Sequence, residues 1–278
     1  MTILVFSFLL LLASFTAGLV GSLTGLGGGI VLIPVLVLLF HIDIHYAMGA
    51  SLISVIATSS GAAAAYLKEG FTNIRIGMFL EVGAVIGALI GALLVAFVSP
   101  KLIAVLFALF LFASAYFSLR RNEKIDVNQP SHLWADRLRL AGSYKTADGV
   151  QDYSVHGVPE ALGIMTIAGA LAGLLGIGAG ALKVLAMDQM MRLPYKVSTS
   201  TSNFIIGITA AVSMGVYFKD GYIVPGIIFP VLIGVAIGAL FGAKILVRAK
   251  SRGLRLFFSI IILLLGVEML YKALTGGI

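Results

Sequence analysis

Two glycine clusters are the residues of this sequence best suited to holding an anion. The first reads Gly21-Ser22-Leu23-Thr24-Gly25-Leu26-Gly27-Gly28-Gly29, and the second reads Gly173-Leu174-Leu175-Gly176-Ile177-Gly178-Ala179-Gly180. Clustered glycines allow a helix to unwind, and a short helix that restarts after the break presents free N–H groups and the positive end of its dipole. A sulfate-like or carboxylate group fits such a helix start. The candidate binding residues at the breaks are Thr24, Gly25, Gly27, Gly28, Gly29, Gly176, Gly178 and Gly180.

Close helix packing through small residues is the alternative explanation for glycine in membrane helices. It accounts well for Gly83, Gly87 and Gly91, which lie inside one long apolar run. It accounts less well for a glycine cluster that occurs twice. We therefore interpret the two clusters as helix breaks beside a central cavity, where unwound backbone is tolerated at membrane depth.

A segment rich in hydroxyl groups follows each expected short helix. The candidate binding residues in these segments are Ser51, Thr58, Ser200, Thr201, Ser202 and Asn203. Neutral donors can hydrogen-bond an anion without holding it as tightly as a fixed charge would. The hydroxyls could instead bond carbonyls of their own helix or of a neighbouring helix, and the sequence leaves both interpretations open.

Charged residues inside apolar runs are further candidates. Lys183 lies three residues after the second cluster, and an intramembrane lysine is costly enough to indicate a function, such as countering an anionic substrate. It could instead snorkel to the surface or pair with Asp188. Glu81 and Glu268 could each take up a coupling proton or be wet at a helix end, and Glu81 is our coupling candidate.

Catalytic and metal-binding motifs are not evident. His41, Asp43 and His45 lie close together, but a metal site needs more ligands than this spacing supplies. The chain has no cysteine, which excludes disulfides and thiolate chemistry, and it has no P-loop, Ser-His-Asp pattern or haem motif. We therefore expect no enzymatic activity, no metal site and no cofactor.

The composition places most of the chain in lipid. Hydrophobic residues make up 60% of the sequence, charged residues 11%, and the mean hydropathy is +1.09. Unbroken apolar runs such as 74–98 and 254–270 match the roughly 20 residues that span a bilayer, and they lack the alternation of membrane β-strands. The predicted fold class is therefore an all-α membrane protein.

The chain also reads as a duplication. Aligning each residue with the one 151 positions later superposes Gly25, Gly27 and Gly29 on Gly176, Gly178 and Gly180 without a gap. Five helical segments are predicted in each half, at about 3–23, 28–40, 46–67, 74–98 and 101–120, and at about 159–175, 180–192, 197–218, 223–247 and 254–273. The predicted domains are a first transmembrane repeat over 1–121, a polar linker over 122–157 and a second repeat over 158–278.

The basic residues predict the orientation. With the N-terminus outside, the cytoplasmic loops receive most lysines and arginines, including those from Arg120 to Lys145, and the outer loops receive only Lys101, Lys219 and Lys272. Because each half has an odd number of crossings, the second repeat is predicted to be inverted. The net charge of +7 then reflects orientation rather than nucleic-acid binding.

We expect a multi-pass protein of the cytoplasmic (inner) membrane, surrounded by lipid, with a cytoplasmic linker in which residues 132–140 could lie on the membrane surface. A homodimer is among the oligomeric states that the sequence permits.

The motifs around the breaks resemble those of the sulfite exporter TauE/SafE family of membrane permeases. The resemblance rests on the first glycine cluster with Pro34, on Ala47-Met48-Gly49-Ala50-Ser51-Leu52, and on Leu193-Pro194-Tyr195-Lys196 with Thr201-Ser202-Asn203. It implies transport of sulfite or of an organosulfonate such as sulfoacetate. The second half departs from the family pattern, because Ala179 interrupts the glycine triplet, Leu185 replaces the proline that would match Pro34, and Lys183 appears.

These observations together predict a secondary transporter that moves a small sulfur-containing anion by alternating access, with Glu81 as the residue for proton coupling. An anion channel is the alternative, and a membrane-embedded enzyme is a weaker one because the sequence offers no clustered nucleophile or metal site. Lys183→Ala is predicted to weaken transport much more than folding.

Overall fold

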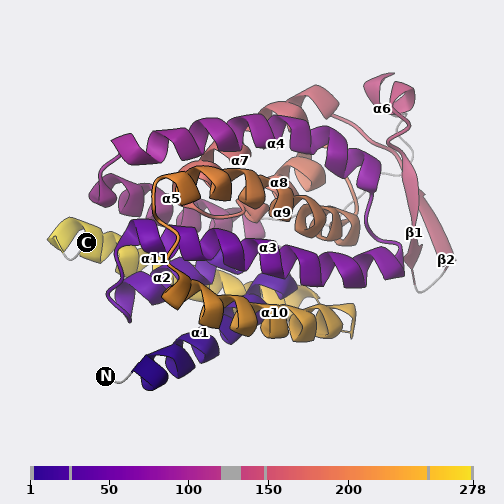
Figure 1. Ribbon diagram of the computed structural model, residues 1–278. Helices are drawn as coiled ribbons and strands as arrows, with labels where there is room; N and C mark the ends of the chain where they lie inside the picture. Colours follow the sequence, from indigo (N-terminus) through magenta and orange to yellow (C-terminus); the bar gives the residue numbers. More distant parts are fainter. Residues whose placement is uncertain (1–2, 25–26, 120–132, 147–148, 249–250, 277–278) are drawn as a thin grey trace.

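The computed structural model describes residues 3–24, 27–119, 133–146, 149–248 and 251–276, and most of them are helical (Figure 1). The first half contains α1 (Ile3–Thr24), α2 (Gly29–Leu38), α3 (Ile44–Glu69), α4 (Ile74–Leu94), a 3-10 turn (Val95–Phe97) and α5 (Pro100–Leu119). The second half contains α7 (Val158–Leu175), α8 (Gly180–Leu185), a π-helical turn (Ala186–Met190), α9 (Tyr195–Lys219), α10 (Pro225–Arg248) and α11 (Ser251–Thr275).

Six helices in the described part of the chain are long and apolar enough to cross a membrane, namely α1, α3, α4, α7, α9 and α10. The predicted all-α membrane fold is therefore confirmed. One element differs from its prediction, because the short helix expected over 180–192 is α-helical only to Leu185 and continues as the π-helical turn.

The linker contains structure that the sequence analysis does not predict. After the short helix α6 (Leu133–Arg137), β1 (Gly142–Thr146) and β2 (Gly149–Tyr153) form an antiparallel hairpin in which Gly142 lies opposite Tyr153. The predicted surface segment 132–140 is helical over only five of its described residues. Ala135 and Leu140 are buried against the start of α4 and the end of the linker, so this segment packs on the protein. His132 lies outside the described residues.

Asn73, which precedes α4, joins the linker to the helices. Its Nδ2 donates to Leu140 O at 2.9 Å and to Tyr153 Oη at 2.8 Å, and its Oδ1 accepts from Ile76 N at 3.1 Å as the N-cap of α4. Burial raises the pKa of the Tyr153 phenol above its ordinary value, although the bond from Asn73 acts in the opposite direction. The phenol therefore remains neutral at this junction. The hairpin lies at the end of the molecule where the chain passes from α3 to α4 (Figure 1).

Glycines let the long helices of one half pack against those of the other. In α4, a Cβ placed on Gly87 would lie 2.0 Å from Thr166 O of α7. In α10, a Cβ placed on Gly238 would lie 2.1 Å from Phe15 O of α1. These two contacts are related by the 151-residue offset, with the halves exchanged, and the same exchange relates Gly83 to Gly234 and Gly91 to Gly242. Small residues at such crossings allow backbones to approach closely. Whether the repeats are inverted in the membrane stays a prediction.

Each glycine break turns the chain back along the helix before it. A Cβ placed on Gly21 near the end of α1 would lie 2.3 Å from Gly28 N, and the ring of Phe6 near the start of α1 packs edge-on against Phe40 at 5.5 Å. The second half repeats this return, since His156 N donates to Met191 O at 3.3 Å. The 10 residues of α2 extend about 15 Å, half of the roughly 30 Å hydrocarbon core. Thus α2 returns toward the start of α1 without crossing the membrane alone.

Candidate functional site

The two glycine breaks meet at the centre of the molecule. A Cβ placed on Gly27 would lie 3.3 Å from Val55 and 3.8 Å from Ile206, and one placed on Gly178 would lie 3.0 Å and 2.7 Å from the same two side chains. Val55 is the twelfth residue of α3, counted from Ile44, and Ile206 is the twelfth of α9, counted from Tyr195. Both side chains are fully buried. The breaks therefore lie halfway along the two central helices, on either side of an apolar contact.

The first break places buried hydroxyls at the start of α2. A Cβ on Gly29 would lie 2.1 Å from Ser51 Oγ, and one on Gly28 would lie 2.8 Å from Ser54 Oγ, so only glycine permits these approaches. Ser51 and Ser54 are fully buried, and neither hydroxyl has a hydrogen-bond partner among the described residues. Thr58 Oγ1 is satisfied, since it donates to Ser54 O and accepts from Gly28 N at 3.4 Å. A helix start with its first N–H groups and two unpartnered hydroxyls has the donors that an oxyanion would need.

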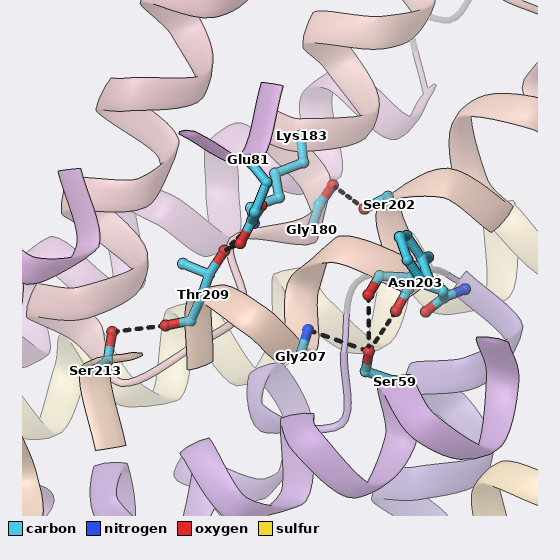
Figure 2. Close-up of polar contacts among 10 residues, drawn as sticks. Ser59, Glu81, Gly180, Lys183, Ser202, Asn203, Gly207, Thr209 and Ser213 are labelled. Carbon is cyan, nitrogen blue, oxygen red and sulfur yellow. Dashed lines mark hydrogen bonds and ion pairs between the residues drawn. The ribbon is translucent and has the colours of Figure 1, made fainter. Parts of the chain in front are cut away.

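The second break is followed by a buried charged cluster. Lys183 Nζ donates to Glu81 Oε2 of α4 at 2.9 Å, and Thr209 Oγ1 of α9 hydrogen-bonds to both the lysine and Glu81 Oε1. Figure 2 shows the three side chains pointing toward one another, and to their lower left Ser213 Oγ donates to Thr209 O at 3.1 Å. Lys183 is 0% and Glu81 3% exposed. The ion pair therefore joins the two halves, whereas the sequence suggested Asp188 as a partner for Lys183.

The charged pair has no counterpart related to it by the duplication. The 151-residue offset aligns Lys183 with Leu32 and Thr209 with Thr58, and it aligns Glu81 with Leu232. Thus both halves have the threonine. Leu32 stands in the first half where the second has Lys183, and Leu232 stands in α10 where α4 has Glu81. The centre is symmetric in shape and asymmetric in charge.

Comparison with known proteins found matches over most of the chain. The family model described as "Sulfite exporter TauE/SafE" matches residues 10–269. The chain belongs to the sulfite exporter TauE/SafE family. It is 32% identical over 241 residues to the "Probable membrane transporter protein YdhB" of Bacillus subtilis (strain 168), with 85% of this chain and 89% of the relative covered.

Two further relatives match along nearly the whole chain. One is the "Probable membrane transporter protein YunE" of Bacillus subtilis (strain 168), 26% identical over 273 residues with 96% of this chain and 98% of the relative covered. The other is the "Probable membrane transporter protein MJ0441" of Methanocaldococcus jannaschii, 26% identical over 277 residues with 94% of each chain covered. No solved structure matches this chain significantly. The family and these names support a role in membrane transport, which is not an enzymatic activity.

The departures of this TauE/SafE protein from the family pattern have local structural effects. Ala179 has φ of +45°, a left-handed conformation that glycine adopts without strain. The helix that begins after it lacks the proline and changes to the π-helical turn after Leu185. Lys183 points into the protein and pairs with Glu81, so it does not snorkel to the surface.

Other candidates predicted from the sequence fall into two groups. Ser202 Oγ donates to Gly180 O at 3.5 Å across the second break, and Gly176 ends α7 in a left-handed conformation. By contrast, Ser200 Oγ donates to Val197 O of its own helix at 3.1 Å, and Thr201 Oγ1 accepts from Asn73 N at 3.0 Å beside the linker. The first group lies at the break, and the second serves local structure.

Asn203 belongs to neither group. Its backbone oxygen accepts from Ser59 Oγ at 2.5 Å, which ties α3 to α9, as Figure 2 shows. Its side-chain amide is 1% exposed and has no hydrogen-bond partner in the described part of the chain. Gly25 and the side chain of Thr24 lie outside what the structure describes, and Glu268 is exposed on α11.

The residues 41–45 form a helix start rather than a ligand cluster. Asp43 Oδ1 accepts from His45 N at 2.9 Å and lies 3.0 Å from His45 Nδ1, and the His45 ring stacks on Tyr222. Within the described residues, no group of three or more His, Asp or Glu side chains could hold a metal ion.

Sequence reasoning did not select Thr209, Val55 or Ile206. The offset that defines the duplication aligns Thr209 with the selected Thr58 and Ile206 with Val55, so applying it to every candidate would have identified Thr209. The two apolar residues carry no chemical signal, because only their position between the breaks distinguishes them from other core residues.

Proposed function

We propose that this chain is a secondary transporter that carries sulfite or an organosulfonate such as sulfoacetate across the cytoplasmic membrane by alternating access. The observation that carries the proposal is the pair of buried, unpartnered hydroxyls, Ser51 and Ser54, at the start of α2. Leaving a buried hydroxyl without a partner costs about 1–3 kcal/mol, and an oxyanion would supply the missing acceptors.

The donors at this site suit a sulfur oxyanion. A sulfite or sulfonate group has three oxygens around one sulfur, so it can accept from both serine hydroxyls while its third oxygen faces the first N–H groups of α2. The helix dipole adds partial positive charge at the same end. Neutral donors of this kind bind an anion reversibly, as transport requires.

Burial of the site favours a carrier over an open channel. Ser51, Ser54, Val55 and Ile206 are all fully buried, so access from either side requires the helices around the breaks to move. The Val55 and Ile206 side chains between the breaks would separate the two access routes. We also propose that the N-terminus is outside and the linker cytoplasmic, because the basic residues concentrate on that side.

The test is flux of labelled sulfite, sulfoacetate, sulfate and acetate through the purified protein in liposomes. Saturable uptake of sulfite or of the sulfonate, competed by the other of the two, is the expected result. Flux that does not saturate and passes as current would instead identify an anion channel. Absence of flux for all four anions, in vesicles shown to hold folded protein, would contradict the proposal.

A further inference from the structure

We propose that the pair of Lys183 and Glu81 is an exchange site, at which a monovalent anionic substrate replaces the Glu81 carboxylate on Lys183 while Glu81 takes up one proton. The inference rests on the function proposed above. It adds a mechanism of coupling and a ratio of one proton per monovalent anion, in the same direction.

The contacts around Glu81 leave Lys183 as its charged neighbour. The carboxylate is held by Lys183 Nζ through Oε2 and by the Thr209 hydroxyl through Oε1. Other titratable groups on the surrounding elements make contacts elsewhere or lie toward helix ends. On α4 itself, Arg75 donates to Arg139 O, and on α7 Glu160 is exposed. On α9, Tyr217 donates to Gly173 O. The remaining ones are Tyr195, Lys196 and Lys219 at the two ends of α9 and Asp188 in the π-helical turn.

Charge balance requires the proton. The pair of Lys183 and Glu81 is neutral in sum, and an anion that joined it alone would leave one buried negative charge, which is costly at membrane depth. If Glu81 gains a proton as the anion arrives, one O–H bond forms on its carboxyl group and the sum stays at zero. Lys183 keeps its three protons and exchanges one acceptor, the carboxylate oxygen, for another, an oxygen of the substrate.

The position of the pair connects it to the hydroxyl site. Thr209 lies three residues after Ile206 on α9, and Lys183 lies three residues after Gly180 on α8, so the cluster is about one turn from the second break. Ser51 and Ser54 lie about one turn or less from Val55 on α3. Both sites therefore lie within about one helical turn of the apolar side chains between the breaks. Because leucine occupies both matching positions, Leu32 and Leu232, the described centre has one exchange site, which sets one proton per anion.

The experiment uses the full-length protein in liposomes with methanesulfonate, whose single negative charge does not change near neutral pH, and with a pH-sensitive dye inside the vesicles. We expect proton and methanesulfonate uptake in equal amounts. The apparent KM should rise with pH by up to about tenfold per unit, since a deprotonated Glu81 competes for Lys183. Glu81→Gln should abolish proton uptake, turn the flux into a current and reduce the pH dependence to less than about twofold.

Two controls make the outcomes distinct. Glu268→Gln changes an exposed acid on α11 and should retain the coupling of the native protein. Lys183→Met combined with Glu81→Gln keeps the site neutral and should fold but bind the anion weakly. Anion flux without protons in the native protein, or unchanged pH dependence in Glu81→Gln, would overturn the exchange site and leave the transporter proposal standing. If sulfite, sulfoacetate and methanesulfonate all fail to move, the proposed function fails and the exchange site with it.

Discussion

Glu81 and Lys183 form an ion pair of 2.9 Å across 102 positions of sequence, with both side chains buried. Removing one partner leaves the other charge without compensation, so we expect Lys183→Ala to lower the free energy of unfolding by roughly 3–5 kcal/mol. The double variant Lys183→Met with Glu81→Gln should recover most of that loss. Thermal unfolding of the purified protein in detergent measures both. This changes the expectation from the sequence alone, which placed the effect of Lys183→Ala on transport rather than on folding.

Ser51→Ala separates binding from stability. Because Ser51 Oγ has no partner in the described part of the chain, its loss should leave the free energy of unfolding unchanged or raise it by up to about 1 kcal/mol. The apparent KM for sulfite should rise about tenfold, which corresponds to the loss of about 1.4 kcal/mol of binding. Liposome flux and thermal unfolding check the two effects. Ser114→Ala is the matched control, since Ser114 Oγ is also buried but donates to Phe110 O at 2.7 Å, and an equal rise in KM there would contradict a role specific to Ser51.

The crossings between the halves should tolerate no side chain at their glycines. Gly87→Ala and Gly238→Ala each place a Cβ within 2.1 Å of a carbonyl oxygen, so both should lower the free energy of unfolding by at least about 1–3 kcal/mol. At Gly163 on α7, an added Cβ meets nothing within 4 Å. Gly163→Ala should therefore raise the free energy of unfolding by about 0.5–1 kcal/mol, because alanine has the higher helix propensity. Comparing the thermal unfolding of the three variants tests the packing. Opposite effects at Gly87 and Gly238 would show that the exchanged contacts are not equivalent.

Asn73→Ala should release the linker hairpin from the helices. The substitution removes the N-cap of α4, worth about 1 kcal/mol, and two side-chain bonds to the linker. Hydrogen exchange at residues 142–146 and 149–153 should become faster, while exchange in α3 and α9 changes little. Gln151→Ala, which removes only the exposed bond from Tyr144 Oη at 3.0 Å, serves as the control. Protection of the hairpin that survives Asn73→Ala would mean that apolar packing alone holds it.

The positions of the spanning helices follow from the sequence because each one is a long apolar run ended by polar or glycine residues. The glycine breaks were predictable because closely clustered glycines favour unwinding of a helix and the cluster occurs twice. The partner of Lys183 was not predictable, because the sequence favours neighbours along a helix such as Asp188, whereas Glu81 becomes a neighbour through the packing of both α4 and α8 against α9. Charges from different helices meet only in three dimensions.

The linker hairpin was missed for a different reason. Its strands have only five residues each, and their polar composition is typical of a loop as well as of an exposed hairpin. Side chains such as Asn73 and Tyr153 then fix the hairpin through bonds that no local pattern encodes.

The exchanged packing of the long helices has a consequence for biosynthesis. The main partner of α1 is α10, which begins at Pro225, 201 positions after the last residue of α1 at Thr24. During translation α1 therefore enters the bilayer well before this partner exists, and its glycine-lined contact stays open until most of the chain has been made. The first half cannot complete its packing alone, so a chain truncated in the linker would expose the contact faces of α1 and α4 to lipid and to quality-control proteases. Such contacts over long sequence separation make assembly a late, single event rather than the docking of two finished parts.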